Sequence, residues 1–155
     1  MTVDVAPLSA AKAEALRLIE SEVGVLTNRV RRASVDHAKA IHPDLHAGSY
    51  AVLTFLVDQG GARAADMVAR FGLDKGAVSR HLSHLEGLGL VVRSSDPADA
   101  RAQNVEPTDA AMRAVATLRR HRRSVFAGKL SSWSEQELRD LAGQLTRYNA
   151  AVGNP

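Results

Sequence analysis

A short segment of the chain, residues 74–88, carries a dense group of hydrogen-bond donors. If the segment is helical, Val78, Leu82 and Leu85 share one side and the donors share the other. None of the donors is acidic; they are Lys75, Ser79, Arg80, His81, Ser83 and His84. Arginine can bind the O6 and N7 atoms of guanine, serine either type of base, and lysine the phosphates. The pattern favours contact with DNA, although a helix with a solvated polar face has the same pattern.

The six histidines raise a metal site as a rival chemistry. Cysteine is absent, which excludes disulfides, thiolate zinc ligands and thiol-based redox sensing by this chain. His37, His42 and His46 flank a break at Pro43 and could share an ion only if the loop curled. No metal site and no cofactor is therefore predicted, and whether these three histidines bind a metal stays open.

Enzymatic chemistry would need a nucleophile with a positioned base, or paired carboxylates in a cleft. The sequence contains no phosphate-binding glycine loop, no serine elbow and no HExxH motif. Ser79 lies near His81 and His84 along the chain, but no third member or oxyanion donor accompanies them. The chain is therefore predicted not to be an enzyme.

The donor-rich segment forms the second half of a predicted helix-turn-helix. A helix over residues 64–71 is expected to end at Gly72, and Asp74 is expected to cap the next helix, which runs to about Leu88. The turn between them is short and contains glycine, as this motif requires. The apolar side of the second helix is expected to pack on Val68 and Phe71.

The neighbouring segments complete a winged helix-turn-helix over residues 45–107. Residues 46–58 are predicted to form a helix closed by Gly60 and Gly61. Residues 90–95 are predicted to form a strand, 96–101 a turn, and 102–106 the return strand of a hairpin. Three helices and a hairpin are the parts of this fold.

Long helices flank this region on both sides. They are expected to begin at Ser9, at Thr108 and at the capping box of Ser134 and Glu137, and the first should end before Pro43. Heptad-like apolar stripes run through the first and last helices, at Leu16, Ile19, Val23, Leu26 and Val30 and at Leu138, Leu141, Leu145, Tyr148 and Val152. Because long apolar stripes are rarely left exposed, residues 9–42 and 108–152 are predicted to form a dimerisation region.

The middle of the chain resembles the MarR family of winged helix-turn-helix transcription regulators. The run from Leu85 to Arg93 matches the family's pattern of leucine-glutamate, glycine-leucine-valine and a further arginine. The family's wing signature is Asp-x-Arg followed by a valine and by a threonine that opens the next helix. This chain resembles it at Asp96, Asp99, Arg101, Val105 and Thr108. The resemblance spans roughly residues 45–110. It departs from the family at residues 62–65, whose sequence Ala-Arg-Ala-Ala lacks the usual serine or threonine cap.

The resemblance implies a mainly α fold with a small β-hairpin wing and a helical dimerisation arm. The helix after Asp74 would enter the major groove, and the wing would lie at the minor groove. There Arg101 would meet concentrated negative potential, and Asp99 would orient its guanidinium group. The DNA-binding residues so predicted are Lys75, Ser79, Arg80, His81, His84, Asp99 and Arg101.

The resemblance also implies a ligand-responsive repressor that binds a near-palindromic operator as a homodimer. Its effector would be a small anionic aromatic molecule, and Arg17, His46 and Tyr50 are the predicted contacts. The alternative is a helical protein-interaction module that does not bind DNA. A hairpin carrying an arginine after an aspartate favours the regulator, because such a module has no need of it.

Composition limits the remaining classes. Of the 155 residues, 45% are hydrophobic and 24% charged, which is typical of a folded globular chain. The net charge of +3 is too small to argue for nucleic acid by itself. No apolar run approaches the ~18 residues that span a membrane, and the first residues lack the layout of a secretory signal. The cytoplasm is the expected location, with no membrane partner.

Overall fold

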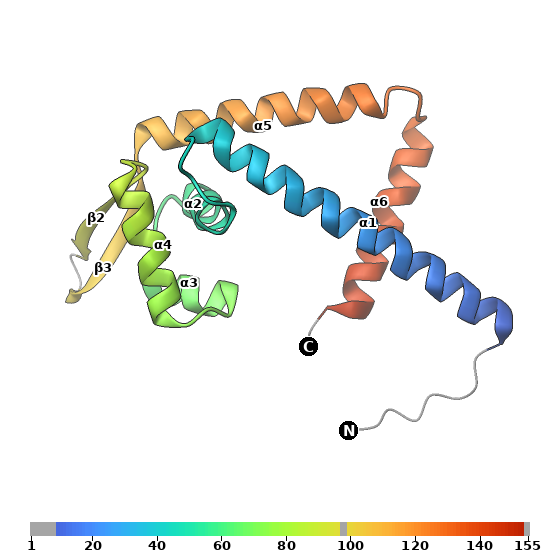
Figure 1. Cartoon of the computed structure of the whole chain (residues 1–155), viewed down its shortest axis with the longest axis horizontal. Coiled ribbons are helices and arrows are strands. Elements are labelled where there is room, and N and C mark those ends of the chain that lie inside the picture. Colours follow the sequence, from blue (N-terminus) through green and yellow to red (C-terminus); the bar gives the residue numbers. More distant parts are fainter. Residues whose placement is uncertain (1–8, 97–98, 154–155) are drawn as a thin grey trace. The chain divides into compact units, whose positions relative to one another are not determined.

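The computed structural model describes residues 9–96 and 99–153, with the side chains of 95–96 and 99–103 outside the description. In chain order the elements are α1 (Ala10–Ile41), α2 (Ala47–Gln59), β1 (Ala62–Arg63), α3 (Ala64–Phe71), α4 (Lys75–Gly87), β2 (Val91–Asp96), β3 (Asp99–Pro107), α5 (Asp109–Lys129) and α6 (Glu135–Val152) (Figure 1). Contacts between residues group the chain into two compact units, residues 1–115 and residues 116–155. The prediction of a mainly α fold with a small β-hairpin is confirmed.

Local capping explains where the helices begin. The backbone N–H groups of Lys12, Ala77 and Ala111 donate to the side chains of Ser9, Asp74 and Thr108, respectively. The side chain of Glu137 accepts from the backbone N–H of Ser134, whose hydroxyl in turn accepts from the backbone N–H of Glu137. The four predicted helix starts that have a capping side chain are confirmed, since each cap satisfies a backbone donor that the helix itself leaves unpaired.

The sheet is larger than the predicted hairpin. β2 and β3 pair antiparallel from Val91 opposite Pro107 to Asp96 opposite Asp99, with an irregularity after Ser95. The expected turn over 96–101 is therefore too long, because β3 already begins at Asp99. β1 also pairs with β3, with Ala62 opposite Val105. The sequence does not reveal this strand, because two residues show no periodicity and their partner lies more than 40 positions away.

Buried apolar side chains from α2, α3 and α4 form the core of the winged region. Val78, Leu82 and Leu85 of α4 are buried, as predicted. The expected packing of these residues on Val68 and Phe71 of α3 stays a prediction. Met67 is fully buried, whereas Val68 and Phe71 are only half-buried, and the ring of Phe71 meets Phe55 edge-on at 5.6 Å. The core that carries α4 therefore centres on Met67 and α2.

Apolar stripes on α1 and α6 are exposed in the single chain. Large hydrophobic side chains retain 40% or more of their exposure at Leu16, Ile19, Leu26 and Val30 of α1 and at Leu141, Leu145 and Val152 of α6. Within residues 9–96 and 99–153, no helix has both the length and the apolar character needed to cross a membrane.

Candidate nucleic-acid interface

The turn between α3 and α4 sets the direction of the candidate recognition helix α4. α3 ends at Gly72, whose φ of 62° lies in the left-handed region, so glycine suits this position. The chain then reaches Asp74, whose carboxylate accepts from the backbone N–H of Ala77 at 2.7 Å. Together the two residues turn the chain sharply from one helix into the next.

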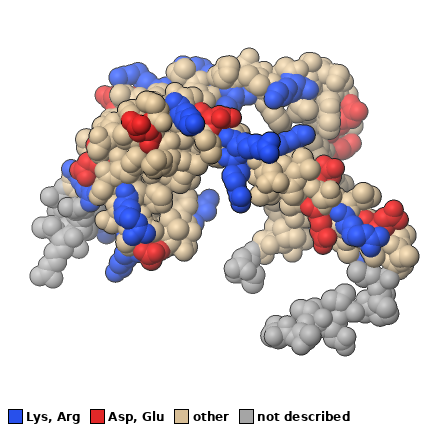
Figure 2. All heavy atoms as spheres, viewed as in Figure 1, with Lys and Arg blue, Asp and Glu red and all other residues tan. Residues whose placement is uncertain are grey.

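Three exposed donors occupy the outer side of α4. Lys75, Ser79 and Arg80 are exposed, and between the capping Asp74 and Glu86 the helix contains no acidic residue. On the face that Figure 2 shows, lysine and arginine side chains are dispersed and interleaved with acidic ones. Lys75, Ser79 and Arg80 are therefore accessible to a partner on this side of α4.

His81 lies against α2. Its Nδ1 atom is 3.0 Å from the Oγ atom of Ser49, a residue that is almost completely buried. A Cβ atom added at Gly48 would come within 2.8 Å of the ring's Cε1 atom. The ring therefore packs closely on the backbone of α2. The prediction grouped His81 with Lys75, Ser79 and Arg80 as DNA contacts, whereas in the structure its ring contacts α2.

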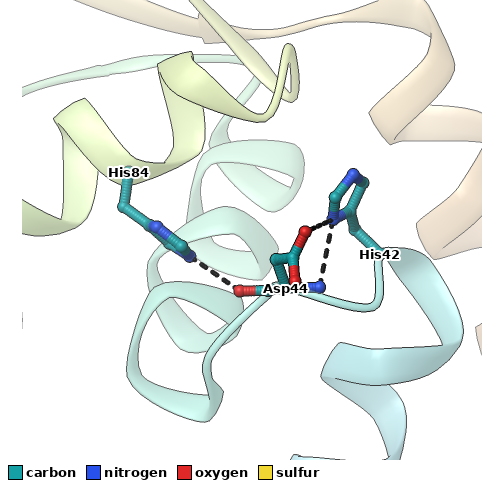
Figure 3. Close-up of polar contacts among 3 residues, drawn as sticks. All are labelled: His42, Asp44 and His84. Atoms are coloured by element: carbon teal, nitrogen blue, oxygen red, sulfur yellow. Dashed lines mark hydrogen bonds and ion pairs between the residues drawn. The ribbon is translucent and has the colours of Figure 1, made fainter.

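His84 also turns toward the rest of the protein, one turn after His81. Its Nε2–H group donates to the backbone carbonyl of Asp44 at 3.1 Å, and its ring stacks on His46 with 4.6 Å between centroids and 4° between planes. The backbone N–H of Asp44 donates to Nδ1 of His42 at 3.2 Å (Figure 3). The loop between α1 and α2 is thus held between two imidazole rings.

The surroundings lower the pKa of His81 below its ordinary value. The main cause is burial, which disfavours the charged form, and the positive charge of Arg80 acts in the same direction, as do His84 and His46 when they are protonated. The ring is therefore held neutral at a pH where a free histidine begins to take up a proton.

A second set of contacts joins α4 to the wing. The Nε atom of Arg93 on β2 lies 2.9 Å from the Glu86 carboxylate, and its terminal nitrogen donates to Ser83 at 3.1 Å. Ser83 is therefore engaged within the protein. Arg93 is not among the predicted site residues, although the spacing of Ser83 and Glu86 on one face of α4 offered the signal.

The two predicted wing residues lie on β3. The backbone of Asp99 pairs with Asp96 at the tip of the hairpin, and Arg101 follows two residues later. Their side chains lie outside the described part of the structure, so their contacts with DNA stay predictions. Figure 1 shows the hairpin beside α4.

The predicted effector residues do not gather in one chain. Tyr50 is buried and its ring lies 6.0 Å from that of His37 on α1, while His46 stacks on His84. Arg17 is exposed and lies on the same helix as His37 but 20 residues earlier, which is about 30 Å along the axis. Only His46 and Tyr50 of the predicted set are near each other.

The candidate metal ligands are also separate. Among the residues with described positions, no group of three or more histidine, cysteine, aspartate or glutamate side chains could hold a metal ion. His37 faces Tyr50, His42 binds the backbone of Asp44, and His46 faces His84.

Comparison with known proteins gives concordant results. A family model described as the MarR family matches residues 44–102. The uncharacterized HTH-type transcriptional regulator YxaD of Bacillus subtilis (strain 168) is 31% identical over 137 residues, which cover 88% of this chain and 94% of that protein.

Solved structures share the fold. A putative MarR family transcriptional regulator from Listeria monocytogenes, complexed with a 26mer DNA, superposes with a TM-score of 0.66 at 19% identity, covering 85% of this chain and 87% of that one. The organohalide-sensing regulator RdhR-CbdbA1625, with 2,4-dichlorophenol bound, superposes with a TM-score of 0.68 at 17% identity, covering 98% of this chain and 89% of that one.

Proposed function

Because this chain belongs to the MarR family of DNA-binding transcription regulators, we propose that it is a ligand-responsive repressor that binds a near-palindromic operator as a homodimer. The observation that carries the proposal is the outer side of α4, where Lys75, Ser79 and Arg80 stand exposed after a capped, glycine-containing turn. Such a helix fits the major groove, where arginine can bind guanine through two hydrogen bonds. A regulator of this kind must reach the chromosome, so the proposed location of the protein is the cytoplasm.

The wing supplies the second proposed contact. β2 and β3 project as an antiparallel hairpin, and Arg93 ties the base of β2 to α4 through Glu86. An arginine near the hairpin tip, Arg101, would enter the minor groove, which attracts arginine more strongly as it narrows. Asp99 would orient it.

The apolar stripes of α1 and α6 support the homodimer. Each helix exposes several leucine, isoleucine or valine side chains along one side, and water contact with them is unfavourable. We propose that a second copy of the chain covers them, through residues 9–42 and 108–152. Two recognition helices related by a twofold axis then require half-sites about 10 base pairs apart.

The effector is proposed to be a small anionic aromatic molecule that binds near Tyr50 and His46. The structurally similar regulator RdhR-CbdbA1625 has a chlorophenol as its bound ligand. In this chain Tyr50 and His37 present neighbouring rings at the junction of α1 and α2, where an aromatic ring could stack. Arg17 of the same chain is not included, because it lies too far along α1.

Selection of DNA from a random-sequence library tests the function. The full chain should enrich a near-palindromic duplex and bind it at least about a thousandfold more tightly than a scrambled duplex at the same salt concentration. Equal affinity for both duplexes, or for neither, would contradict the proposal. The protein-interaction module would then be the better interpretation.

A further inference from the structure

Six residues from three places in the chain meet where the loop before α2 contacts α4. We call them the histidine junction: His42, Asp44, His46, Ser49, His81 and His84. Four of the six are imidazoles, and two of these four belong to the helix proposed to read DNA. The contacts join segments that are 32 and 40 positions apart in sequence, Ser49 to His81 and Asp44 to His84.

Several of these contacts suit neutral imidazoles. The backbone N–H of Asp44 needs a lone pair on Nδ1 of His42, which a protonated ring lacks. His46 and His84 lie face to face at 4.6 Å, so two positive charges there would repel each other. The ring of His81 is packed on Gly48 and Ser49, where a charge would be poorly solvated.

From this geometry we propose that His81 and His84 are positioning residues that hold α4 in its DNA-binding orientation while the histidine junction is neutral, and that protonation of the junction lowers the affinity for specific DNA. The inference rests on the proposed function, since it requires α4 to read an operator. The expected change in DNA affinity with falling pH is opposite to that of exposed histidines. Exposed histidines would add positive charge beside the phosphates and strengthen binding in acid.

The other charges around the junction do not remove this effect. Within α4, Arg80 is positive and opposes a proton on His81. The Asp44 carboxylate lies 4.0 Å from Nδ1 of His42 and is largely exposed, so solvent screens its charge. On β2, Arg93 pairs with Glu86. On α3, Asp66 accepts from the backbone of Arg63 and Arg70 lies over the ring of Phe71.

The direction with pH follows from the lowered pKa of His81. A group whose pKa is lower in the folded arrangement than in a free chain stabilises that arrangement above its ordinary pKa, and this stabilisation is lost as the pH falls from about 6.5. The fraction of molecules with α4 correctly placed then decreases, and the apparent dissociation constant for the operator rises in proportion.

The test uses the full wild-type chain and a fluorescent duplex selected from a random library at pH 7.5. Anisotropy titrations at pH 7.5, 6.5 and 5.5, at constant ionic strength, compare this duplex with a scrambled one. We expect the affinity for the selected duplex to fall by about fivefold or more between pH 7.5 and 5.5. The scrambled duplex should bind equally or more tightly in acid, because the protein gains positive charge.

The two possible failures are distinct. A chain that prefers the selected duplex at pH 7.5 and binds it as tightly or more tightly at pH 5.5 overturns this inference and leaves the proposed function intact. A chain that prefers no duplex at pH 7.5 overturns both. Circular dichroism at each pH shows whether the protein remains folded, and a loss of affinity that only follows global unfolding also counts against the inference.

Two variants with matched controls locate the effect. His81→Asn should reduce the fall in affinity between pH 7.5 and 5.5, whereas His121→Asn, at an exposed site on α5, should keep the wild-type pH profile. Gly48→Ala should displace the His81 ring and weaken specific binding already at pH 7.5. Gly143→Ala, where nothing lies within 4 Å of the added Cβ atom, should not. If the His81→Asn and His121→Asn profiles coincide with that of the wild type, the inference is wrong.

Discussion

Single residues on α4 divide into two groups with different neighbours. Lys75, Ser79 and Arg80 are exposed, whereas His81 and His84 contact α2 and the loop before it. An arginine that binds guanine through two hydrogen bonds discriminates against other bases by about 1–3 kcal/mol. Arg80→Ala should therefore weaken operator binding by that amount and scrambled-duplex binding far less. Titrations of both duplexes at one salt concentration measure the ratio.

The control for Arg80 is Arg147→Ala, which removes the same charge from an exposed site on α6. It should change both affinities slightly and equally, since only long-range charge is lost. Equal losses for Arg80→Ala and Arg147→Ala would show that Arg80 does not read a base.

Oxidation gives a second prediction at this scale. The chain has no cysteine, so hydrogen peroxide should not release it from DNA within minutes. Met67 is fully buried, whereas Met112 is 38% exposed, so any slow release should disappear in Met112→Leu. The measurement is anisotropy of the protein–operator complex with time. Rapid release that a thiol reductant reverses would contradict this expectation.

Among the elements, the hairpin of β2 and β3 is proposed to contact the minor groove, whereas α4 is proposed to contact the major groove. Its base is held to α4 by Arg93, and its proposed DNA contact is Arg101. A minor-groove arginine responds to groove width more than to base identity. Arg101→Ala should therefore weaken the operator and the scrambled duplex alike, with a larger loss for operators flanked by A-tracts. Titration against duplexes that differ only in their flanks checks this, and an unchanged affinity for all of them would remove the wing from the interface.

For the whole molecule, the exposed stripes predict the oligomeric state. Sedimentation at micromolar concentration should give a mass near twice 16.6 kDa. Leu141→Lys places a charge in the α6 stripe and should produce monomers, because an unpaired charge is unfavourable in an apolar interface. Ala150→Lys introduces the same charge on the other side of α6 and should remain dimeric. A monomeric wild-type chain would contradict the proposed architecture.

Local sequence was enough to predict most elements of this protein. Helix periodicity, the caps at Ser9, Asp74, Thr108 and Ser134, and the left-handed glycines at Gly60 and Gly72 act over a few residues, so they can be read without a fold. The same is true of the apolar side of α4 and of Lys75, Ser79 and Arg80 as donors on its polar side.

Only the tertiary structure decided which polar residues of α4 stay exposed. His81 and His84 have the chemistry of DNA-contacting residues. Their rings nevertheless form hydrogen bonds within the protein, with Ser49 and Asp44, which lie 32 and 40 positions away in the sequence. β1 likewise exists because β3 offers it backbone partners from a distant part of the chain. In both cases the energy comes from hydrogen bonds between segments that folding brings together, and a pattern within one segment does not contain its partner.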